Sequence, residues 1–132
     1  MYLIDTNIFL EILLGQEKSN IARQFLSSHV GELAMSDFTL HSIGVVLFRL
    51  KRPELFLEFI NDTLPNIEVV TLPNPDYPRV VEFHEKYGLD FDDAYQCAVS
   101  TAHGLTIVTM DEDFRKAPYS VKVVFLYSGD YL

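Results

Sequence analysis

The feature that most constrains the fold is a regular alternation of short apolar runs with longer segments of helical periodicity. The apolar runs, several of them rich in Val and Ile, predict β-strands at 2–5, 32–36, 67–71, 105–109 and 121–126. The segments between them predict helices at 7–14, 19–28, 37–50, 53–64, 76–87 and 91–103. Strands that alternate with helices form crossover units, whose helices cover both faces of a sheet. The sequence therefore predicts an α/β fold of three layers around a mostly parallel sheet.

The residues at the helix ends and the chain length agree with this organisation. Pro53 suits the first turn of a helix, where a missing N–H costs nothing, and Gly88 and Gly104 stand where C-terminal caps are expected. The chain has 132 residues and shows no internal repeat and no linker. We therefore expect one domain that covers residues 1–132.

Cysteine usage and the lengths of the apolar runs indicate the cellular setting. Cys97 is the single cysteine, so no internal disulfide can form, and a reducing cytoplasm suits such a chain. No apolar run reaches the roughly 18 residues that a membrane span needs, and no leader peptide precedes the first strand. These features predict a cytoplasmic protein without a membrane segment.

The net charge of −9 bears on the class of ligand. A protein that binds nucleic acid passively is usually basic, because neutralising phosphates provides most of the affinity. Taken alone, the charge therefore argues against nucleic acid, and solubility explains most of it. A site built from several carboxylates would also leave such a charge before its cation binds.

Polar residues stand at the carboxyl ends of three predicted strands. Asp5 ends the first strand, Ser36 and Asp37 end the second, and Thr109 and Asp111 end the fourth. Sheets of this class bind ligands beyond the carboxyl ends of their strands. These positions are therefore candidates for one crevice, although Asp5 also suits the N-cap of the next helix.

A second acidic stretch, "GLDFDDAYQCA", begins the helix predicted at 91–103. Asp90 suits the N-cap, and Asp93 stands where a capping box places an acidic side chain. Only one carboxylate is needed for the cap, however, and Asp93 shares its helix face with Ala94 and Cys97. A carboxylate on an inward face needs a partner, so Asp93 is also a candidate site residue.

Together these carboxylates indicate a divalent cation. Asp5, Asp93 and Asp111 would raise one another's pKa in a shared cleft, and a cation would remove that repulsion. Ligands that are all oxygen favour Mg²⁺ or Mn²⁺ over zinc, and the four histidines show no zinc-ligand spacing. A cation of this kind suits phosphodiester hydrolysis. Cys97 fits the core better than the role of a nucleophile.

The motifs "LIDTNIF" and "LDFDDAYQCAVSTAHGLTIVTMDEDF", in this order and at this separation, resemble those of the PIN-domain family. In size the chain is similar to the VapC-type ribonuclease toxins. The resemblance covers essentially the whole chain and implies a five-stranded parallel sheet of order 3-2-1-4-5, with helices on both faces. It also implies RNA cleavage that depends on Mg²⁺ or Mn²⁺, a homodimer, and an antitoxin protein that would shield the site.

The resemblance assigns roles to particular residues. Asp5, Asp93 and Asp111 fall on the family's catalytic, metal-binding aspartates, and Asp113 follows as a further metal ligand. Asn7 is the polar helper of the first motif. The hydroxyl group of Thr109 would orient a ligand or a water molecule.

One residue of the family pattern is missing. The family usually carries a glutamate in the helix after the second strand, three positions past a Thr or Ser, and no glutamate occurs here between Glu32 and Glu54. The sequence "SDFTLHSIGVVLF" places Ser42 at that position, with His41 as the less favoured alternative. Asp37 is a substitute ligand that would reach the metal from the strand end, or simply a favourable charge in the first helical turn.

Basic residues bear on how RNA would approach an acidic protein. Arg115 and Lys116 follow the last acidic motif and are the expected phosphate contacts. The cluster at Arg49, Lys51 and Arg52 also fits a helix C-terminus, where cations are favourable.

Two other functions remain open from the sequence. One is a degenerate PIN domain that binds RNA or a protein without cutting, as the missing glutamate suggests. The other is a phospho-accepting receiver domain, but the strand at 67–71 lacks the aspartate that a receiver needs. Finally, the strand at 121–126 is a plausible sheet edge, where Lys122 would discourage unwanted pairing.

Overall fold

The computed structural model, which describes residues 1–126, contains one five-stranded sheet with the strand order β3-β2-β1-β4-β5. All four neighbouring strand pairs are parallel, so the expected fold class and strand order are confirmed. The strands are β1 (Tyr2–Ile4), β2 (Leu33–Ser36), β3 (Glu68–Val70), β4 (Thr106–Thr109) and β5 (Val123–Phe125).

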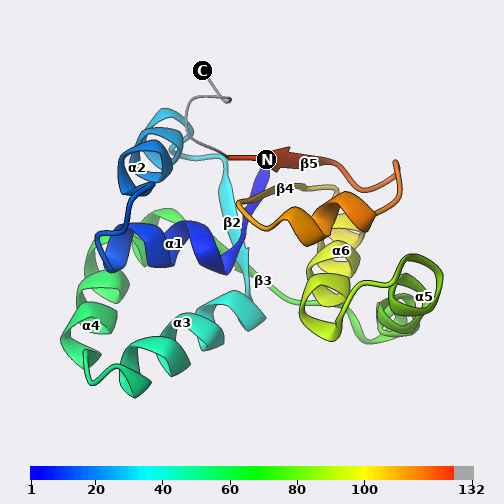
Figure 1. Cartoon of the computed structure of the whole chain (residues 1–132), viewed down its shortest axis with the longest axis horizontal. Helices are drawn as coiled ribbons and strands as arrows, with labels where there is room; N and C mark the ends of the chain where they lie inside the picture. The colour runs from blue at the N-terminus through cyan, green and yellow to red at the C-terminus, as the bar shows by residue number, and fades with distance from the viewer. Residues whose placement is uncertain (127–132) are drawn as a thin grey trace.

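Helices cover both faces of this sheet (Figure 1). The α-helices are α1 (Thr6–Leu13), α2 (Ser19–Ser28), α3 (Asp37–Arg49), α4 (Pro53–Asp62), α5 (Pro78–Tyr87) and α6 (Phe91–His103). Three short 3₁₀-helices are η1 (Leu64–Asn66), η2 (Asn74–Asp76) and η3 (Glu112–Lys116). The first four α-helices pack on one face and α5 and α6 on the other, which gives three layers.

Alternating side chains of the central strand serve two separate cores. Leu3 packs with residues of α5 and α6, whereas Ile4 packs with residues of α1 to α4, and neither side chain is exposed to solvent. Val108 and Ile107 of β4 divide between the two cores in the same way. A strand buried on both faces needs apolar residues at consecutive positions, which explains the unbroken apolar runs.

The predicted helix ends are largely correct, and the differences have local causes. Gly88 and Gly104 form left-handed C-caps with φ of 72° and 66°, and Pro53 is the first residue of α4. The helix predicted at 53–64 stops at Asp62, because Pro65 cannot donate the N–H that a continuing α-helix needs, and η1 follows. Likewise η2 precedes α5 where one helix was expected at 76–87.

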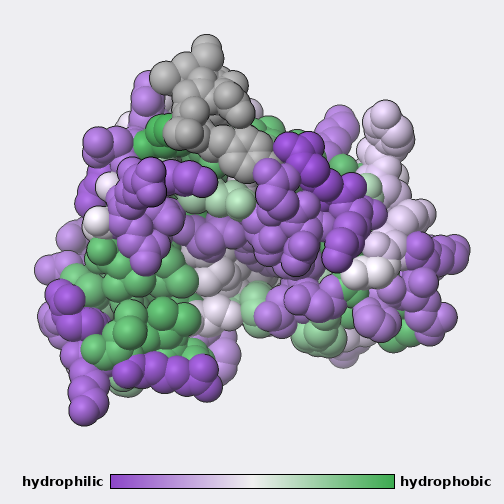
Figure 2. All heavy atoms as spheres, viewed as in Figure 1, coloured by the Kyte–Doolittle hydropathy of each residue, from purple (hydrophilic) through white to green (hydrophobic). Residues whose placement is uncertain are grey.

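Exposed apolar side chains gather on α3 and α4. Phe48 on α3, Leu50 just after it and Leu57 on α4 are 60%, 51% and 59% exposed. Figure 2 shows a large green area at the lower left, the side on which α3 and α4 lie in Figure 1. A hollow of about 550 Å³ lies beside it, lined by Asp37, Leu40, His41, Gly44, Val45, Phe48 and Phe56. Within residues 1–126, no helix has the length and apolar character that crossing a membrane requires.

Candidate functional site

The candidate site is a cleft of about 240 Å³ beyond the carboxyl ends of β1 and β4. Asp5 directly follows β1, Asp111 comes two residues after β4, and Asp93 lies in the first turn of α6. The residues that line the cleft are Asp5, Thr6, Asn7, Leu10, Phe38, Ser42, Asp92, Asp93, Gln96 and Asp111. The three aspartates that were expected to meet therefore do lie around one space.

Asp5 is buried on one side of this cleft, and both of its carboxylate oxygens are hydrogen-bonded. Oδ1 accepts from the Thr6 backbone N–H at 2.9 Å and from Gln96 Nε2 at 3.1 Å. Oδ2 accepts from Thr109 Oγ1 at 2.7 Å and from Asn7 Nδ2 at 3.2 Å. Asp5 is thus both the N-cap of α1 and a carboxylate held in one orientation by side chains from other elements.

Thr109 and Asn7 also accept hydrogen bonds from the backbone of the segment that follows β4. Thr109 Oγ1 accepts from the backbone N–H of Asp111 at 3.0 Å, and Asn7 Oδ1 accepts from that of Met110 at 3.1 Å. On the opposite side, Gln96 Nε2 also donates to Thr39 Oγ1 at 2.9 Å. We call Asp5, Asn7, Thr39, Gln96 and Thr109 the Asp5 network.

A second set of carboxylates lies near Asp5, and among them Asp111 Oδ1 accepts from the backbone N–H of Asp113 at 2.9 Å. Asp93, Asp111 and Asp113 each offer an oxygen, and these oxygens lie within 4.8 Å of one another. Asp93 is buried, Asp111 is half-buried and Asp113 is exposed. We call these three residues the acidic group. Their arrangement provides the oxygen ligands that a divalent cation prefers.

Burial and repulsion raise the pKa of Asp93 and of Asp5 in this cleft. The pKa of Asp93 rises to about 7, first because of burial and then because of repulsion from Asp90, Asp111, Asp5 and Asp113. Burial also raises the pKa of Asp5, although the hydrogen bonds from Thr109 and Gln96 oppose the shift. A group of anions that resists ionisation is a site that a bound cation would stabilise.

The residues considered for the missing glutamate divide between two places. Ser42 lines the cleft and is half-buried, so the favoured position does face the acidic residues. His41 is exposed and lines the apolar hollow on α3 instead. Asp37 lines that same hollow, and its carboxylate accepts a hydrogen bond from Tyr95 Oη at 2.6 Å. The structure therefore does not bring Asp37 to the cleft as a substitute ligand.

The two basic residues expected at the substrate side lie on η3, directly after the acidic group. Lys116 Nζ lies 3.9 Å from Asp113 Oδ1, and Arg115 pairs with Glu112. The Arg115 guanidinium also lies over the ring of Phe125, 4.3 Å from the ring centroid. Both side chains are more than half exposed.

Two polar residues of the Asp5 network, Gln96 and Thr39, are absent from the sequence-based set of candidates. Both are buried, with Gln96 only 1% exposed and Thr39 fully covered. A signal for Gln96 exists in the sequence, since it stands one helical turn after Asp93 on an otherwise small and apolar face. Cys97, by contrast, is buried in the core, and burial raises the pKa of its thiol to about 12.

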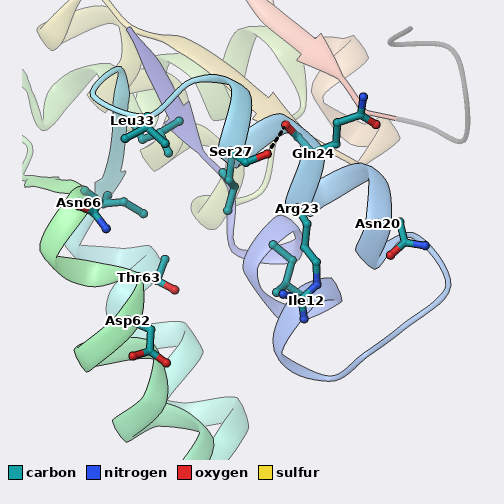
Figure 3. Close-up of a pocket in the computed structure, with 12 residues that line it drawn as sticks. Ile12, Asn20, Arg23, Gln24, Ser27, Leu33, Asp62, Thr63 and Asn66 are labelled. Atoms are coloured by element: carbon teal, nitrogen blue, oxygen red, sulfur yellow. Dashed lines mark hydrogen bonds between the residues drawn. The ribbon is translucent and has the colours of Figure 1, made fainter.

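A larger hollow of about 620 Å³ lies away from the predicted residues, between α2 and the end of α4 (Figure 3). Its lining includes Ile12 of α1, Arg23 of α2 and Asp62 of α4. None of the candidate site residues lines it, so its size does not make it the candidate site.

Comparison with known protein families identifies the family of this chain. The PIN domain family matches residues 2–118, which is most of the chain. The chain belongs to the PIN domain family. The resemblance of its two motifs is thereby confirmed, and the cleft lies where the PIN motifs meet. A search of curated protein sequences found no match.

Solved structures share the PIN fold over nearly the whole chain. A toxin–antitoxin complex from Klebsiella pneumoniae has a TM-score of 0.78 at 23% identity, covering 97% of this chain and 99% of that one. FitAcB from Neisseria gonorrhoeae has a TM-score of 0.76 at 24% identity, with 93% and 96% covered. VapC20 of Mycobacterium tuberculosis, described as a sarcin-ricin loop cleaving toxin, has a TM-score of 0.75 at 18% identity, with 92% and 99% covered. At these identities the likeness establishes the fold alone.

Proposed function

We propose that this PIN domain protein is a metal-dependent endoribonuclease that uses Mg²⁺ or Mn²⁺ to hydrolyse RNA phosphodiester bonds. The observation that carries the proposal is the acidic group, whose oxygens lie within 4.8 Å of one another beside the buried carboxylate of Asp5. Similar folds in toxins, one of them described as cleaving the sarcin-ricin loop, support the choice of RNA as the substrate.

The residues of the cleft fit a divalent cation. The ligand atoms on offer are carboxylate oxygens. The pKa of the buried Asp93 is about 7, because burial and the neighbouring aspartates oppose its negative charge. A bound cation would offset that opposition. Asp93, Asp111 and Asp113 would hold the cation, with Asp5 as the buried fourth carboxylate. When bound, such a cation would polarise the phosphate and lower the pKa of a water molecule.

The remaining residues orient these carboxylates and receive the substrate. Thr109 holds an Asp5 oxygen with its hydroxyl group and, as an acceptor, fixes the backbone N–H of Asp111. Asn7 connects Asp5 to the segment after β4. Arg115 and Lys116 extend from η3, where they would contact phosphates of the RNA; Lys116 lies beside Asp113, and Arg115 lies over the ring of Phe125. Fixed orientation of this kind is what a metal site requires.

A second function is favoured by one observation: Ser42, which the family resemblance aligns with a usual glutamate, lines the cleft as a residue without charge. With one carboxylate fewer, the cleft would bind a cation less tightly. The alternative is therefore a PIN domain that binds RNA or a protein without cutting.

Partner proteins are part of the same proposal. The exposed apolar patch on α3 and α4 offers a surface for an antitoxin or for a second copy of the chain in a homodimer. Structures of toxin–antitoxin complexes among the similar folds support an antitoxin partner. A cytoplasmic location is consistent with the single, buried cysteine.

The experiment that tests the activity is cleavage of a mixed-sequence single-stranded RNA with Mn²⁺, with Mg²⁺ and with EDTA. Asp5→Asn is run alongside, since it keeps the shape of the side chain and removes its charge. Asp62→Asn on α4 is the matched control, because it makes the same change outside the cleft.

Cutting that needs the metal and is lost only in Asp5→Asn would establish the nuclease and show that the absent glutamate is dispensable. We expect cleavage in Asp5→Asn to fall by about 100-fold or more. A loss of about 1–3 kcal/mol in the free energy of unfolding accompanies it, because the new amide nitrogen meets hydrogen-bond donors that now bond a carboxylate oxygen. Full activity in that variant would overturn the role of Asp5. No cutting by folded wild-type protein with either metal would favour the RNA- or protein-binding alternative.

A further inference from the structure

One buried atom of the cleft has no hydrogen-bond partner. Within residues 1–126, Gln96 Oε1 is the only buried side-chain nitrogen or oxygen that neither accepts nor donates a hydrogen bond. An unpaired buried carbonyl destabilises the folded state, so the position of this oxygen needs an explanation.

The explanation lies at the other end of the same amide group. Gln96 Nε2 donates to Asp5 Oδ1 at 3.1 Å and to Thr39 Oγ1 at 2.9 Å. A turn of the amide by 180° would place Oε1 against an oxygen of the Asp5 carboxylate, which can only accept. The contacts with Asp5 therefore fix the amide in the orientation that leaves Oε1 unpaired.

This amide group connects three elements at the base of the cleft. Gln96 lies on α6, one turn after Asp93, while Thr39 lies on α3, one turn before Ser42. Thr39 Oγ1 in turn accepts from Ser36 Oγ at 3.3 Å, at the end of β2. No carboxylate stands at Ser42 to connect α3 with Asp5. Gln96 makes that connection instead, because its Nε2 bonds to both Asp5 and Thr39 of α3.

We infer that Gln96 is a positioning residue, whose amide group holds the Asp5 carboxylate in the orientation that cation binding requires. The inference rests on the proposed function and deepens it. Gln96 does not touch the substrate; it acts through Asp5, and the unpaired Oε1 is the stability cost of that arrangement.

The first test observes the amide group directly. In ¹⁵N-labelled wild-type protein, the side-chain NH₂ signals of Gln96 should shift on addition of Mg²⁺, in step with the backbone signals of Asp93. Those of Gln24, which is exposed on α2, should stay in place. Because this titration uses only wild-type protein, no substitution can disturb the fold. A Gln96 signal that stays constant while that of Asp93 shifts would overturn the inference.

The second test removes the amide group. Gln96→Met keeps the length of the side chain and eliminates both the donor and the unpaired oxygen. We expect Mn²⁺ binding, measured by calorimetry without RNA, to weaken roughly tenfold, as for other residues that orient metal ligands. The free energy of unfolding without metal should change little, because the loss of the donor to Asp5 and Thr39 is offset by removal of the unpaired oxygen. Gln24→Met on α2 makes the same change outside the cleft and should alter neither quantity.

Coupling to Asp5 separates a positioning role from a structural one. In the Asp5→Asn background, Gln96→Met should produce no further change in Mn²⁺ affinity, because the carboxylate that it orients is gone. Unchanged Mn²⁺ affinity in Gln96→Met alone would overturn the inference, as would equal losses in both backgrounds. Wild-type protein that binds no Mn²⁺ would instead overturn the proposed function, so the two failures are distinguishable.

Discussion

The Asp5 network and the acidic group both contribute residues to the same cleft, but their carboxylates have opposite surroundings. In the network, each oxygen of a buried carboxylate accepts two hydrogen bonds, so folding alone fixes its geometry. In the acidic group, three carboxylates lie within 4.8 Å of one another, and repulsion raises the pKa of Asp93. One set of side chains is thus held by internal hydrogen bonds, whereas the other keeps like charges close together.

The largest expected effect is a pH dependence that originates in the acidic group. Because the pKa of Asp93 is about 7 in the folded protein and about 3.8 when unfolded, the folded state binds more protons between these values. The free energy of unfolding without metal should therefore fall as pH rises from about 4 to about 7, by roughly 2–4 kcal/mol. Urea denaturation in EDTA across this range measures it.

Asp93→Asn should remove most of this dependence and stabilise the metal-free protein at neutral pH. Asp62→Asn, on the exposed face of α4, should leave the dependence unchanged. An equally steep loss of stability in Asp93→Asn would mean that the repulsion does not centre on this residue.

The next largest effect concerns the Asp5 network and has the opposite sign. Thr109→Val keeps the shape of the side chain but removes the donor to Asp5 and the acceptor for the N–H of Asp111. We expect a loss of about 1–3 kcal/mol in the free energy of unfolding, because buried partners are left unpaired. Thr106→Val, at the start of the same strand, is the control. Equal stabilities of the two variants would show that the network adds little.

Adding a carboxylate to the cleft should shift the balance toward cation binding. Ser42→Glu places an acid on α3 where the cleft has none, and we expect Mn²⁺ affinity to rise roughly tenfold, since charge count tunes such sites. His41→Glu makes a comparable change one residue earlier, facing the apolar hollow, and should have no effect. A binding isotherm for Ser42→Glu that matches wild type would contradict the assignment of Ser42 to the missing glutamate position.

The smallest effect is expected at the exposed side chain of Lys116 on η3. Lys116→Ala should weaken RNA binding only two- to threefold and reduce its salt dependence by about one phosphate contact, because exposed charges are well screened. Binding is measured in the Asp5→Asn background, which prevents cleavage. Lys86→Ala removes a lysine that also pairs with a carboxylate, 3.5 Å away on α5, and serves as the control. An equal loss in both variants would argue against a specific contact at η3.

Sequence reasoning predicted the fold because each layer has its own periodicity. The short apolar runs correspond to strands buried on both faces, and Gly88 and Gly104 cap helices as expected. The motif resemblance supplied the strand order, which places β1 beside β4 and so Asp5 near Asp111. Boundaries were less accurate where proline changed the local hydrogen bonding, as at Pro65.

The candidate site was predictable only in part. Asp5, Asp93 and Asp111 stand out as charges beside apolar runs, and the cleft brings all three together. Gln96 and Thr39 did not stand out, because no local sequence pattern encodes their contacts. Gln96 bonds to Asp5, which is 91 residues away along the chain, and to Thr39, which is 57 residues away. Asp37 resembled a strand-end ligand, yet Tyr95 from α6 holds its carboxylate elsewhere.

Asp5 also has a backbone role that links the site to the whole sheet. Its amide donates to Val108 O at 2.9 Å, which continues the central β1–β4 ladder to the floor of the cleft. In hydrogen exchange with D₂O, this amide should therefore be among the slowest of the chain and exchange through global unfolding. A single proton thus reports on both folding and the site, and any substitution that loosens the sheet centre would disturb the cleft as well.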